Sequence, residues 1–428
     1  MPMTIKDERL SLLSSQGPTF CLAKWLQVTL DLEHGTTHSC HHPKRHLIPL
    51  EGLQENPAQL HNTPYKKRMR GFMMEGLRPR ECFYCWDLED INPKALSDRL
   101  IKSTDDWAFE RLNEVLTAPQ KDFSPSYLEL MFSSKCNLSC AYCMADVSSK
   151  IFQEMNQFGP YPVRQHDHRA SELKIIPNPN PYQEAFWKWF PQILPSLRYL
   201  RLTGGEPFLV DETLKLLNFI EEHPQPDLQL AINSNCSLPW DKIHPYVSKL
   251  KSLLENKSLK GIELYASVDT AGEQAEYIRS GLDYKLFLQN IENFKIEIPE
   301  LQVVIMCTFN VLSFENFPAL IKDVETLKAK FENVILDISI LKNPEYLRPE
   351  ILYSTFKNKL SKIKLDQSNF CSHERDKWNN LLTLLEEGQK RADLENLKTD
   401  LKSFLKEYDK RLNFEFSKCF PDSALALK

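Results

Sequence analysis

The chain has 428 residues, of which 42% are hydrophobic and 26% charged, a composition typical of a folded globular protein. At the usual domain size of about 100 to 200 residues, this length predicts two or three structural units. Lys and Arg number 53 and Asp and Glu 58, so the formal net charge of -5 gives no sign of a nucleic acid or an anionic membrane as partner.

Residues 1–16 are polar and charged and lack the apolar core of a secretory signal. No apolar run approaches the roughly 18 residues of a membrane span, so we expect a cytoplasmic protein without a membrane partner. The chain has 11 cysteines. In a reducing compartment cysteines serve as metal ligands or free thiols more often than as disulfides, and their spacing indicates which are ligands.

Four cysteines lie in the first hundred residues: Cys21, Cys40, Cys82 and Cys85. Four thiols saturate one tetrahedral metal or one cubane iron-sulfur cluster, so this segment is a candidate metal site, with zinc as the alternative to a cluster. Strand-like residues 20–32, a turn at His34 and Gly35, and residues 36–40 predict a hairpin. Residues 62–75 predict a helix whose short basic run is a solvated face.

Six of the eleven histidines also lie in this segment: His34, His38, His41, His42, His46 and His61. Imidazole titrates near neutrality, so a histidine here can complete a metal site or relay protons. A solvated loop beside Pro43 explains most of them better. His38 and His42 flank Cys40 and are the first candidates for a metal-binding role.

Three further thiols, Cys136, Cys140 and Cys143, follow the predicted strand 127–132 with the spacing C-x3-C-x2-C. Thiolates at this spacing can converge on one face of a loop and bind three irons of a 4Fe-4S cluster, which leaves the fourth iron without a protein ligand. Structural zinc is usually held by C-x2-C pairs, and a ferredoxin motif supplies a fourth nearby cysteine, so both fit less well. An iron without a protein ligand is a reaction site.

From residue 125 to residue 345, apolar runs rich in Val, Ile, Leu and Tyr alternate with longer amphipathic segments. The predicted strands span residues 127–132, 198–203, 228–234, 261–268, 301–309 and 333–340. The predicted helices include residues 212–222, 240–254, 284–294 and 317–331. Six strand-helix repeats predict an α/β fold whose parallel sheet forms a partial (β/α)6 TIM-like barrel. Active-site groups on such sheets gather beyond the C-terminal ends of the strands.

Unusual residues occupy these strand ends. The second strand is followed by Thr203, Gly204, Gly205, Glu206 and Pro207. The two glycines allow the backbone to approach a ligand closely. The third strand ends in the small polar residues Asn233, Ser234 and Asn235, which can bind a ligand or cap the next helix. The fourth ends in Ser267, Val268 and Asp269, and Arg279 lies on the predicted helix that follows.

The remaining features carry weaker signals. Cys236, Cys307 and Cys419 are expected to be packing residues, although Cys307 is also a weak candidate for a proton or hydrogen-atom donor. The connection after Cys143 is long enough to cover the active side. Its candidate substrate-binding residues are Arg164, His166, Asp167 and His168. After Pro344 the spacing of apolar residues predicts a helical region, packed on the barrel or on a partner subunit, to which we assign no chemistry.

The three cysteines, with Tyr142 before the third, resemble the signature of the radical S-adenosylmethionine (SAM) superfamily, and the similarity extends over residues 125–345. The resemblance implies that SAM chelates the open iron and that one electron from the cluster cleaves it to a 5'-deoxyadenosyl radical. The segment from Gly204 to Pro207 resembles the family's Gly-Gly-Glu-Pro motif. SAM-binding roles follow for Tyr142, Gly204, Gly205, Glu206, Pro207, Ser234, Ser267, Asp269 and Arg279.

Gly35 and Cys40 on the predicted hairpin, followed by Cys82 and Cys85, resemble the auxiliary-cluster region of the SPASM and twitch subfamilies. In those relatives the region usually follows the barrel, whereas here it precedes it, and the long SPASM run of cysteines is missing. The resemblance therefore implies a twitch-like domain with one second 4Fe-4S cluster. The expected domains are residues 1–110 for this cluster, 125–345 for the barrel and 346–428 for the helical region.

The resemblance implies an enzyme that abstracts a hydrogen atom from a peptide or protein substrate and takes electrons from a donor such as flavodoxin or ferredoxin. One alternative is a radical SAM dehydrogenase or epimerase of a small polar metabolite. Another is a non-catalytic iron-sulfur or zinc module that binds a partner or senses redox state. The near-neutral charge and the Gly204, Gly205 and Glu206 segment speak against that module.

Overall fold

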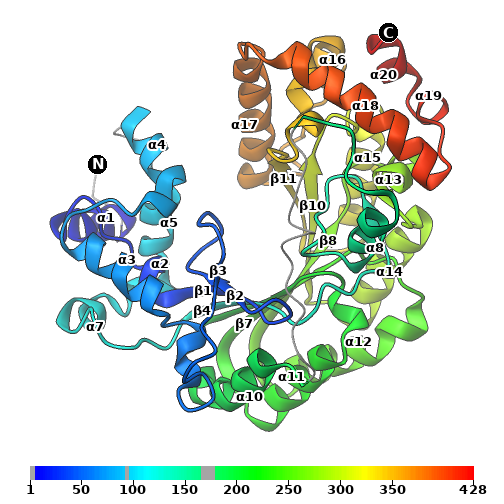
Figure 1. Cartoon of the computed structure of the whole chain (residues 1–428). Coiled ribbons are helices and arrows are strands. Elements are labelled where there is room, and N and C mark those ends of the chain that lie inside the picture. The colour runs from blue at the N-terminus through cyan, green and yellow to red at the C-terminus, as the bar shows by residue number, and fades with distance from the viewer. Residues whose placement is uncertain (1–4, 92–95, 165–178) are drawn as a thin grey trace.

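The computed structural model describes residues 5–91, 96–164 and 179–428. Within these residues, nine strands form one sheet that curves into an open arc (Figure 1). In order of pairing, the strands are β11 (Val334–Ile340), β10 (Gln302–Phe309), β8 (Leu259–Ser267), β7 (Gln225–Ser234), β6 (Tyr199–Thr203), β4 (Tyr127–Met131), β1 (Gln27–Asp31), β2 (Thr36–His38) and β3 (His46–Leu47). Every pairing from β11 to β1 is parallel, whereas β2 is antiparallel to β1 and to β3.

The six strands predicted for residues 125–345 are confirmed as β4, β6, β7, β8, β10 and β11. In β7 the sheet is covered on both faces, since the adjacent residues Leu230 and Ala231, whose side chains point to opposite faces, are both fully buried. The predicted helices between them are confirmed as α11 (Asp211–Glu222), α12 (Trp240–Glu255), α14 (Tyr284–Glu297) and α15 (Phe317–Lys330). Figure 1 shows α11, α12 and α14 on the outside of the arc.

The N-terminal segment extends this sheet by a further parallel strand. Strand β1 pairs with β4 in register, from Gln27 opposite Tyr127 to Asp31 opposite Met131, and all five residues of β1 are buried. The predicted hairpin is confirmed, since β2 turns back along β1. The prediction of a strand over residues 20–32 is wrong for its first half, because Ala23–Leu26 form helix α2.

Short helices surround β1 and have a core of their own. They are α1 (Ile5–Ser15), α3 (Pro64–Met74), α4 (Phe83–Ile91), α5 (Asp98–Thr104), α6 (Asp106–Phe109) and α7 (Leu112–Thr117). Helix α3 confirms the helix predicted at residues 62–75, but the prediction that its basic run is a solvated face is wrong for Lys66 and Arg70, which are buried. Trp25, Trp86, Val115 and Phe123 belong to this core, which is separate from the core of the main sheet. The domain boundaries stay predictions, because β1 belongs to the shared sheet.

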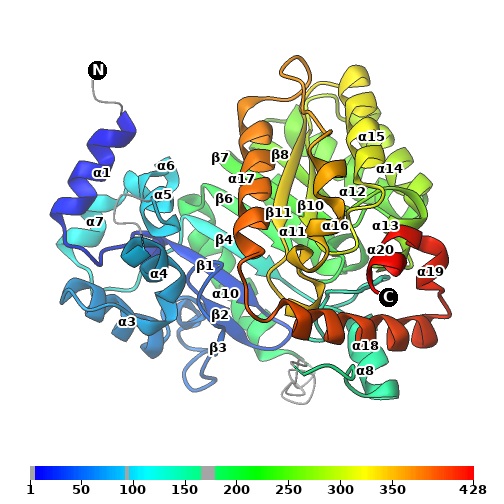
Figure 2. The same ribbon diagram turned by 90° about the horizontal axis from the view of Figure 1, so that it is seen from above.

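The helical C-terminal region packs on the edge strand of the main sheet. Its helices are α16 (Tyr353–Leu360), α17 (Ser372–Gly388), α18 (Leu394–Leu412), α19 (Phe416–Cys419) and α20 (Pro421–Ala426). Glu374 of α17 is fully buried and accepts a 2.7 Å hydrogen bond from the Leu336 backbone N–H of the edge strand β11. Figure 2 shows α1 and α7 at the opposite end of the molecule from α19 and α20.

Further elements are the two-stranded sheet of β5 (Ser139–Cys140) and β9 (Arg279–Ser280), and helices α8 (Ser149–Phe158), α10 (Pro181–Ile193) and α13 (Gly272–Ile278). Figure 1 shows α10 beside α11 on the outside of the arc. Among the helices of the described residues, none has both the length and the apolar character that crossing a membrane requires.

Candidate functional site

The loop after β4 brings three thiols to one cavity. Cys136, Cys140 and Cys143 all line a cavity of about 190 Å³ at the C-terminal ends of the parallel strands. Strand β5 fixes the middle of the loop, since it pairs with β9 and places Cys140 opposite Arg279. Cys140 is buried and the other two thiols are half-buried. The spacing C-x3-C-x2-C therefore does place all three cysteines around a common space.

Gly204 and Gly205 let the turn after β6 lie against this cysteine loop. Gly204 has a φ of +118°, which favours glycine. The backbone N–H of Gly205 donates to the Ser133 carbonyl at 3.1 Å, and that of Glu206 donates to the Lys135 carbonyl at 2.8 Å. Both glycines also line the thiol cavity. The close approach predicted for a ligand is thus already required by the neighbouring loop.

Glu206 lies behind the cavity wall. Its buried carboxylate accepts hydrogen bonds from Ser234 Oγ at 2.9 Å and from the backbone N–H of Asn235 at 2.8 Å. Burial raises the pKa of Glu206 to about 7. Ser234 and Asn235 do line the cavity, so Glu206 positions the end of β7 beside the thiols. Pro207, also buried, begins the 3-10 turn that follows.

Asp269 anchors a second buried network. It accepts hydrogen bonds from Tyr142 Oη at 2.9 Å and from Arg279 Nε at 2.9 Å, and it is fully buried. Arg279 lies in β9 directly after α13, so the prediction that it lies on a helix is wrong. Tyr142 and Arg279 line the cavity, and Arg279 Nη1 lies 3.9 Å from Cys140 Sγ. Burial raises the pKa of the Cys140 thiol to about 12, while Arg279 acts against that rise.

Strands β8 and β10 close the other side of the cavity. Ser267 lines it, as do Met306 and Thr308, which the sequence did not single out. Cys307 is fully buried, donates from Sγ to the Asp269 carbonyl at 3.5 Å and does not line this cavity. Because side chains alternate across a strand, Met306 and Thr308 point to the opposite face from Cys307. The sequence alone does not show which of these two faces borders the cavity.

The four N-terminal cysteines come from separate segments and lie near one another. Cys21 and Cys85 are buried, and Cys40 and Cys82 are half-buried. Burial raises the pKa of Cys82 and of Cys85 to about 12, and the charges of Cys21 and Cys40 add to both shifts. Buried Lys24 acts against the rise at Cys82 and forms an ion pair with Glu81. In the part of the chain that the structure describes, no three His, Cys, Asp or Glu side chains are grouped so as to hold a metal ion.

The prediction that most of the six histidines are solvated is wrong, since two are buried and three half-buried: His38 and His61, and His34, His42 and His46. The two candidates for a metal-binding role bond to other partners. His38 Nδ1 is hydrogen-bonded to the Cys40 carbonyl, and His42 Nε2 lies 2.6 Å from Asp98 Oδ2 and stacks on Tyr84. Of the predicted substrate-binding loop, Arg164 is exposed and lies 3.7 Å from Asp400. The other three candidates fall outside the described residues: His166, Asp167 and His168.

One contact comes from a segment to which the sequence assigned no chemistry. Tyr408 of α18 is buried and donates to the Tyr277 carbonyl at 2.9 Å and to the Ser139 carbonyl at 3.3 Å. Ser139 precedes Cys140, so the C-terminal region contacts the cysteine loop directly. The apolar spacing of α18 predicts a buried face, but no local signal points to this partner 269 residues away.

Comparisons with known proteins give limited similarity. No protein-family model matches the chain. GTP 3',8-cyclase of Sulfurimonas denitrificans is 24% identical over 160 residues, which are 37% of this chain and 39% of the cyclase. Crystal structures of Streptococcus suis SuiB, alone, bound to SAM and bound to the precursor peptide SuiA, are 14% identical, cover 85–86% of this chain and 69–70% of SuiB, and give TM-scores of 0.34–0.35. Matches of this extent do not place the chain in a family.

Proposed function

We propose that this chain is a radical SAM enzyme. The observation that carries the proposal is the composition of the thiol cavity, where Cys136, Cys140 and Cys143 share one space with the glycine turn after β6. Three thiols from one loop fit a cluster with one iron left open. The similarity to GTP 3',8-cyclase, a radical SAM enzyme, supports this proposal.

The three thiolates would hold a 4Fe-4S cluster that, when bound, supplies the electron for cleaving SAM to methionine and a 5'-deoxyadenosyl radical. The backbone of Gly204 and Gly205 and the hydroxyls of Ser234 and Ser267 line the cavity and would bind SAM. Of the other predicted SAM-binding residues, Tyr142 and Arg279 also line the cavity, whereas three lie behind its wall and position it: Glu206, Pro207 and Asp269.

Arg279 has a defined electrostatic role in this proposal. Its guanidinium is held by Asp269 and reaches Cys140 Sγ, so a positive charge faces a thiol that must lose its proton to bind iron. The ion pair also prevents the guanidinium from turning away. Arg279 therefore stabilises the ligated form of Cys140, and Asp269 is a positioning residue.

The four N-terminal cysteines form a proposed second site. Burial, and to a smaller extent the charge of Cys21, raises the pKa of Cys40, Cys82 and Cys85, which supports a common site for the four cysteines. Four thiols would saturate a second 4Fe-4S cluster and leave it to transfer electrons rather than to bind substrate. Flavodoxin or ferredoxin is the proposed external donor. A peptide or protein is the first proposed substrate and a small polar metabolite the second.

Anaerobic turnover tests the main proposal. The full chain is reconstituted with iron and sulfide, mixed with SAM and dithionite, and assayed for 5'-deoxyadenosine. We expect product from the wild type, none from Cys140→Ala, and product from the matched variant Cys236→Ala, whose buried thiol lies outside the cavity. A wild-type protein with intact clusters and no product would favour the binding or redox-sensing module.

Metal analysis of a triple alanine variant at Cys136, Cys140 and Cys143 separates the two sites. We expect about four irons to remain, the content of one saturated cubane cluster. Zinc without iron in this variant would overturn the proposed second cluster in favour of a zinc site.

A further inference from the structure

A second cavity, called here the connecting cavity, lies between the thiol cavity and the N-terminal hairpin. Its volume is about 200 Å³, and it shares Val147, Thr203 and Gly204 with the thiol cavity. It also shares lining residues with a larger, outer cavity of about 740 Å³: Asp31, His38, Arg45 and Glu129. A group bound in the connecting cavity would therefore lie beside the thiol cavity and be reached from the outer cavity.

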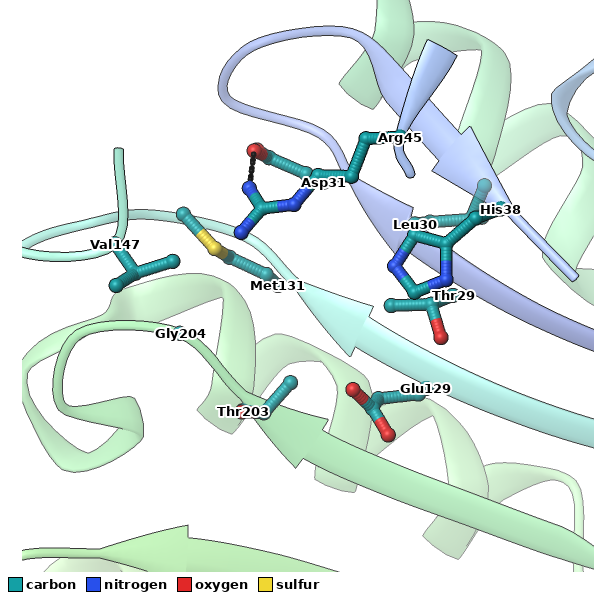
Figure 3. A pocket seen from close by; sticks show the side chains of 10 residues that line it. All are labelled: Thr29, Leu30, Asp31, His38, Arg45, Glu129, Met131, Val147, Thr203 and Gly204. Atoms are coloured by element: carbon teal, nitrogen blue, oxygen red, sulfur yellow. Dashed lines mark hydrogen bonds and ion pairs between the residues drawn. The ribbon is translucent and has the colours of Figure 1, made fainter. Parts of the chain in front are cut away.

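Two strands supply acceptors to this connecting cavity. Glu129 of β4 pairs in register with Thr29 of β1, so the two side chains lie on the same face of the sheet. Thr29 is 9% exposed, and its hydroxyl has no hydrogen-bond partner among residues 5–91, 96–164 and 179–428. Figure 3 shows this hydroxyl on the side of Thr29 that faces the Glu129 carboxylate. A buried hydroxyl without a partner costs free energy that a bound ligand would recover.

The cationic side chains beside the cavity already have partners. Arg45 Nη1 lies 3.2 Å from Asp31 and 3.1 Å from Asp146, so one guanidinium faces two carboxylates (Figure 3 shows the first contact). Arg201 is opposite Glu129 on β6, but it donates to Asn233 at 2.8 Å and lies over the Tyr265 ring.

The Glu129 carboxylate is not in a close ion pair with Lys or Arg in the described part of the chain, although Arg201 on the neighbouring strand compensates it at longer range: against the effect of burial, the charges of Tyr127 and Glu129 raise the pKa of Arg201. Among the described residues its ion-pair contact is His41 Nδ1 at 3.3 Å. A further anion would meet a guanidinium already shared by two carboxylates, whereas a cation would meet a carboxylate that has no Lys or Arg ion-pair partner among them.

We propose that the connecting cavity binds the primary ammonium group of the substrate. An ammonium group has one positive charge and three N–H donors, and the cavity offers the Glu129 carboxylate and the Thr29 and Thr203 hydroxyls as acceptors. The inference rests on the proposed function only in that it calls this ligand the substrate. The ammonium group would anchor the substrate so that a carbon near the nitrogen lies beside the thiol cavity.

Matched probes of one size test the charge preference. The reconstituted full chain is titrated with n-butylammonium, 1-butanol and butyrate, and binding is followed by ligand-observed NMR. We expect saturable binding of the ammonium probe, at least about tenfold tighter than that of the other two. Equal binding of all three, or tighter binding of butyrate, would overturn the proposal. Free lysine and a lysine-containing tripeptide then distinguish a small-molecule source of the ammonium group from a peptide source.

Two variants locate the binding site. Glu129→Gln keeps the shape and removes the charge, and Thr29→Val keeps the shape and removes the hydroxyl, so each should weaken n-butylammonium binding, the first by about tenfold or more. Glu332→Gln, at an exposed position, should leave binding unchanged. If either cavity variant folds and binds the probe as the wild type does, the assignment is wrong. The titration contains neither SAM nor reductant, so its result is independent of 5'-deoxyadenosine formation.

Discussion

The turn after β6 leaves no room for a side chain at Gly205. A Cβ atom there would lie 2.3 Å from the Lys135 carbonyl oxygen and 2.5 Å from that of Ser134. Both atoms belong to the backbone that leads to Cys136, so they cannot rotate away as a flexible side chain can. Restoring an ordinary contact of about 3.4 Å moves the turn and the loop apart by about 1 Å. We expect Gly205→Ala to lower the free energy of unfolding by about 2 to 3 kcal/mol.

Urea denaturation and iron analysis check this expectation. Gly71→Ala in α3 is the matched control, because a Cβ atom there meets only Gln120 Nε2, at 3.7 Å. Alanine favours a helix over glycine by about 0.5 to 1 kcal/mol, so the control should keep or gain stability. Iron bound after reconstitution should fall in Gly205→Ala and remain in Gly71→Ala. Wild-type stability and iron content in Gly205→Ala would refute the view that this glycine serves the cysteine loop.

Three other variants probe the buried contacts. Tyr408→Phe removes the hydroxyl that donates to the Ser139 carbonyl, so it should lower the unfolding free energy by about 1 kcal/mol and reduce the iron content. Unchanged values would show that α18 does not stabilise the cysteine loop. Burial raises the pKa of Glu206 from its usual value of 4.5 to about 7. Between these two pH values the carboxyl group is protonated in the folded chain and ionised in the unfolded chain. As the pH rises from 4.5 to 7, the unfolding free energy of the wild type should therefore fall relative to that of Glu206→Gln, by up to about 1 kcal/mol per pH unit. Urea denaturation at several pH values measures this difference, and a difference that does not change with pH would contradict the raised pKa. Cys307→Ala should retain 5'-deoxyadenosine formation because Sγ lies outside the cavity; a folded, cluster-loaded variant without activity would restore Cys307 as a donor.

The sequence predicted the parallel strands of residues 125–345 because each is an apolar run followed by a longer amphipathic segment. It did not predict that β1 continues the same sheet. The partner of β1 lies 100 residues away, as Gln27 opposite Tyr127 shows, and pairing at that separation leaves no local pattern. The helix at Ala23–Leu26 was missed for a related reason, since four apolar residues before a strand read as part of it.

The sequence predicted the residues of the candidate site that belong to a recognisable motif. It did not predict which of their side chains face the cavity. The three cysteines, the glycine turn and Ser267 all lie at the cavity. Glu206 and Asp269 belong to the same motifs but lie behind the lining, because their carboxylates are taken by the protein's own donors. The contact of Tyr408 with the cysteine loop depends on tertiary packing alone.

The protein holds the cysteine loop from three directions. Backbone N–H groups of the turn at Gly205 donate hydrogen bonds to it, strand β9 pairs with it, and Tyr408 of the C-terminal region donates a hydrogen bond to it. Its thiols resist deprotonation, since burial raises the pKa of Cys140 to about 12. Binding of the proposed cluster would therefore require these thiols to release their protons. Arg279, whose guanidinium touches Cys140 Sγ, is placed to lower that electrostatic cost, so its charge should affect the pH at which iron binds more than the fold itself.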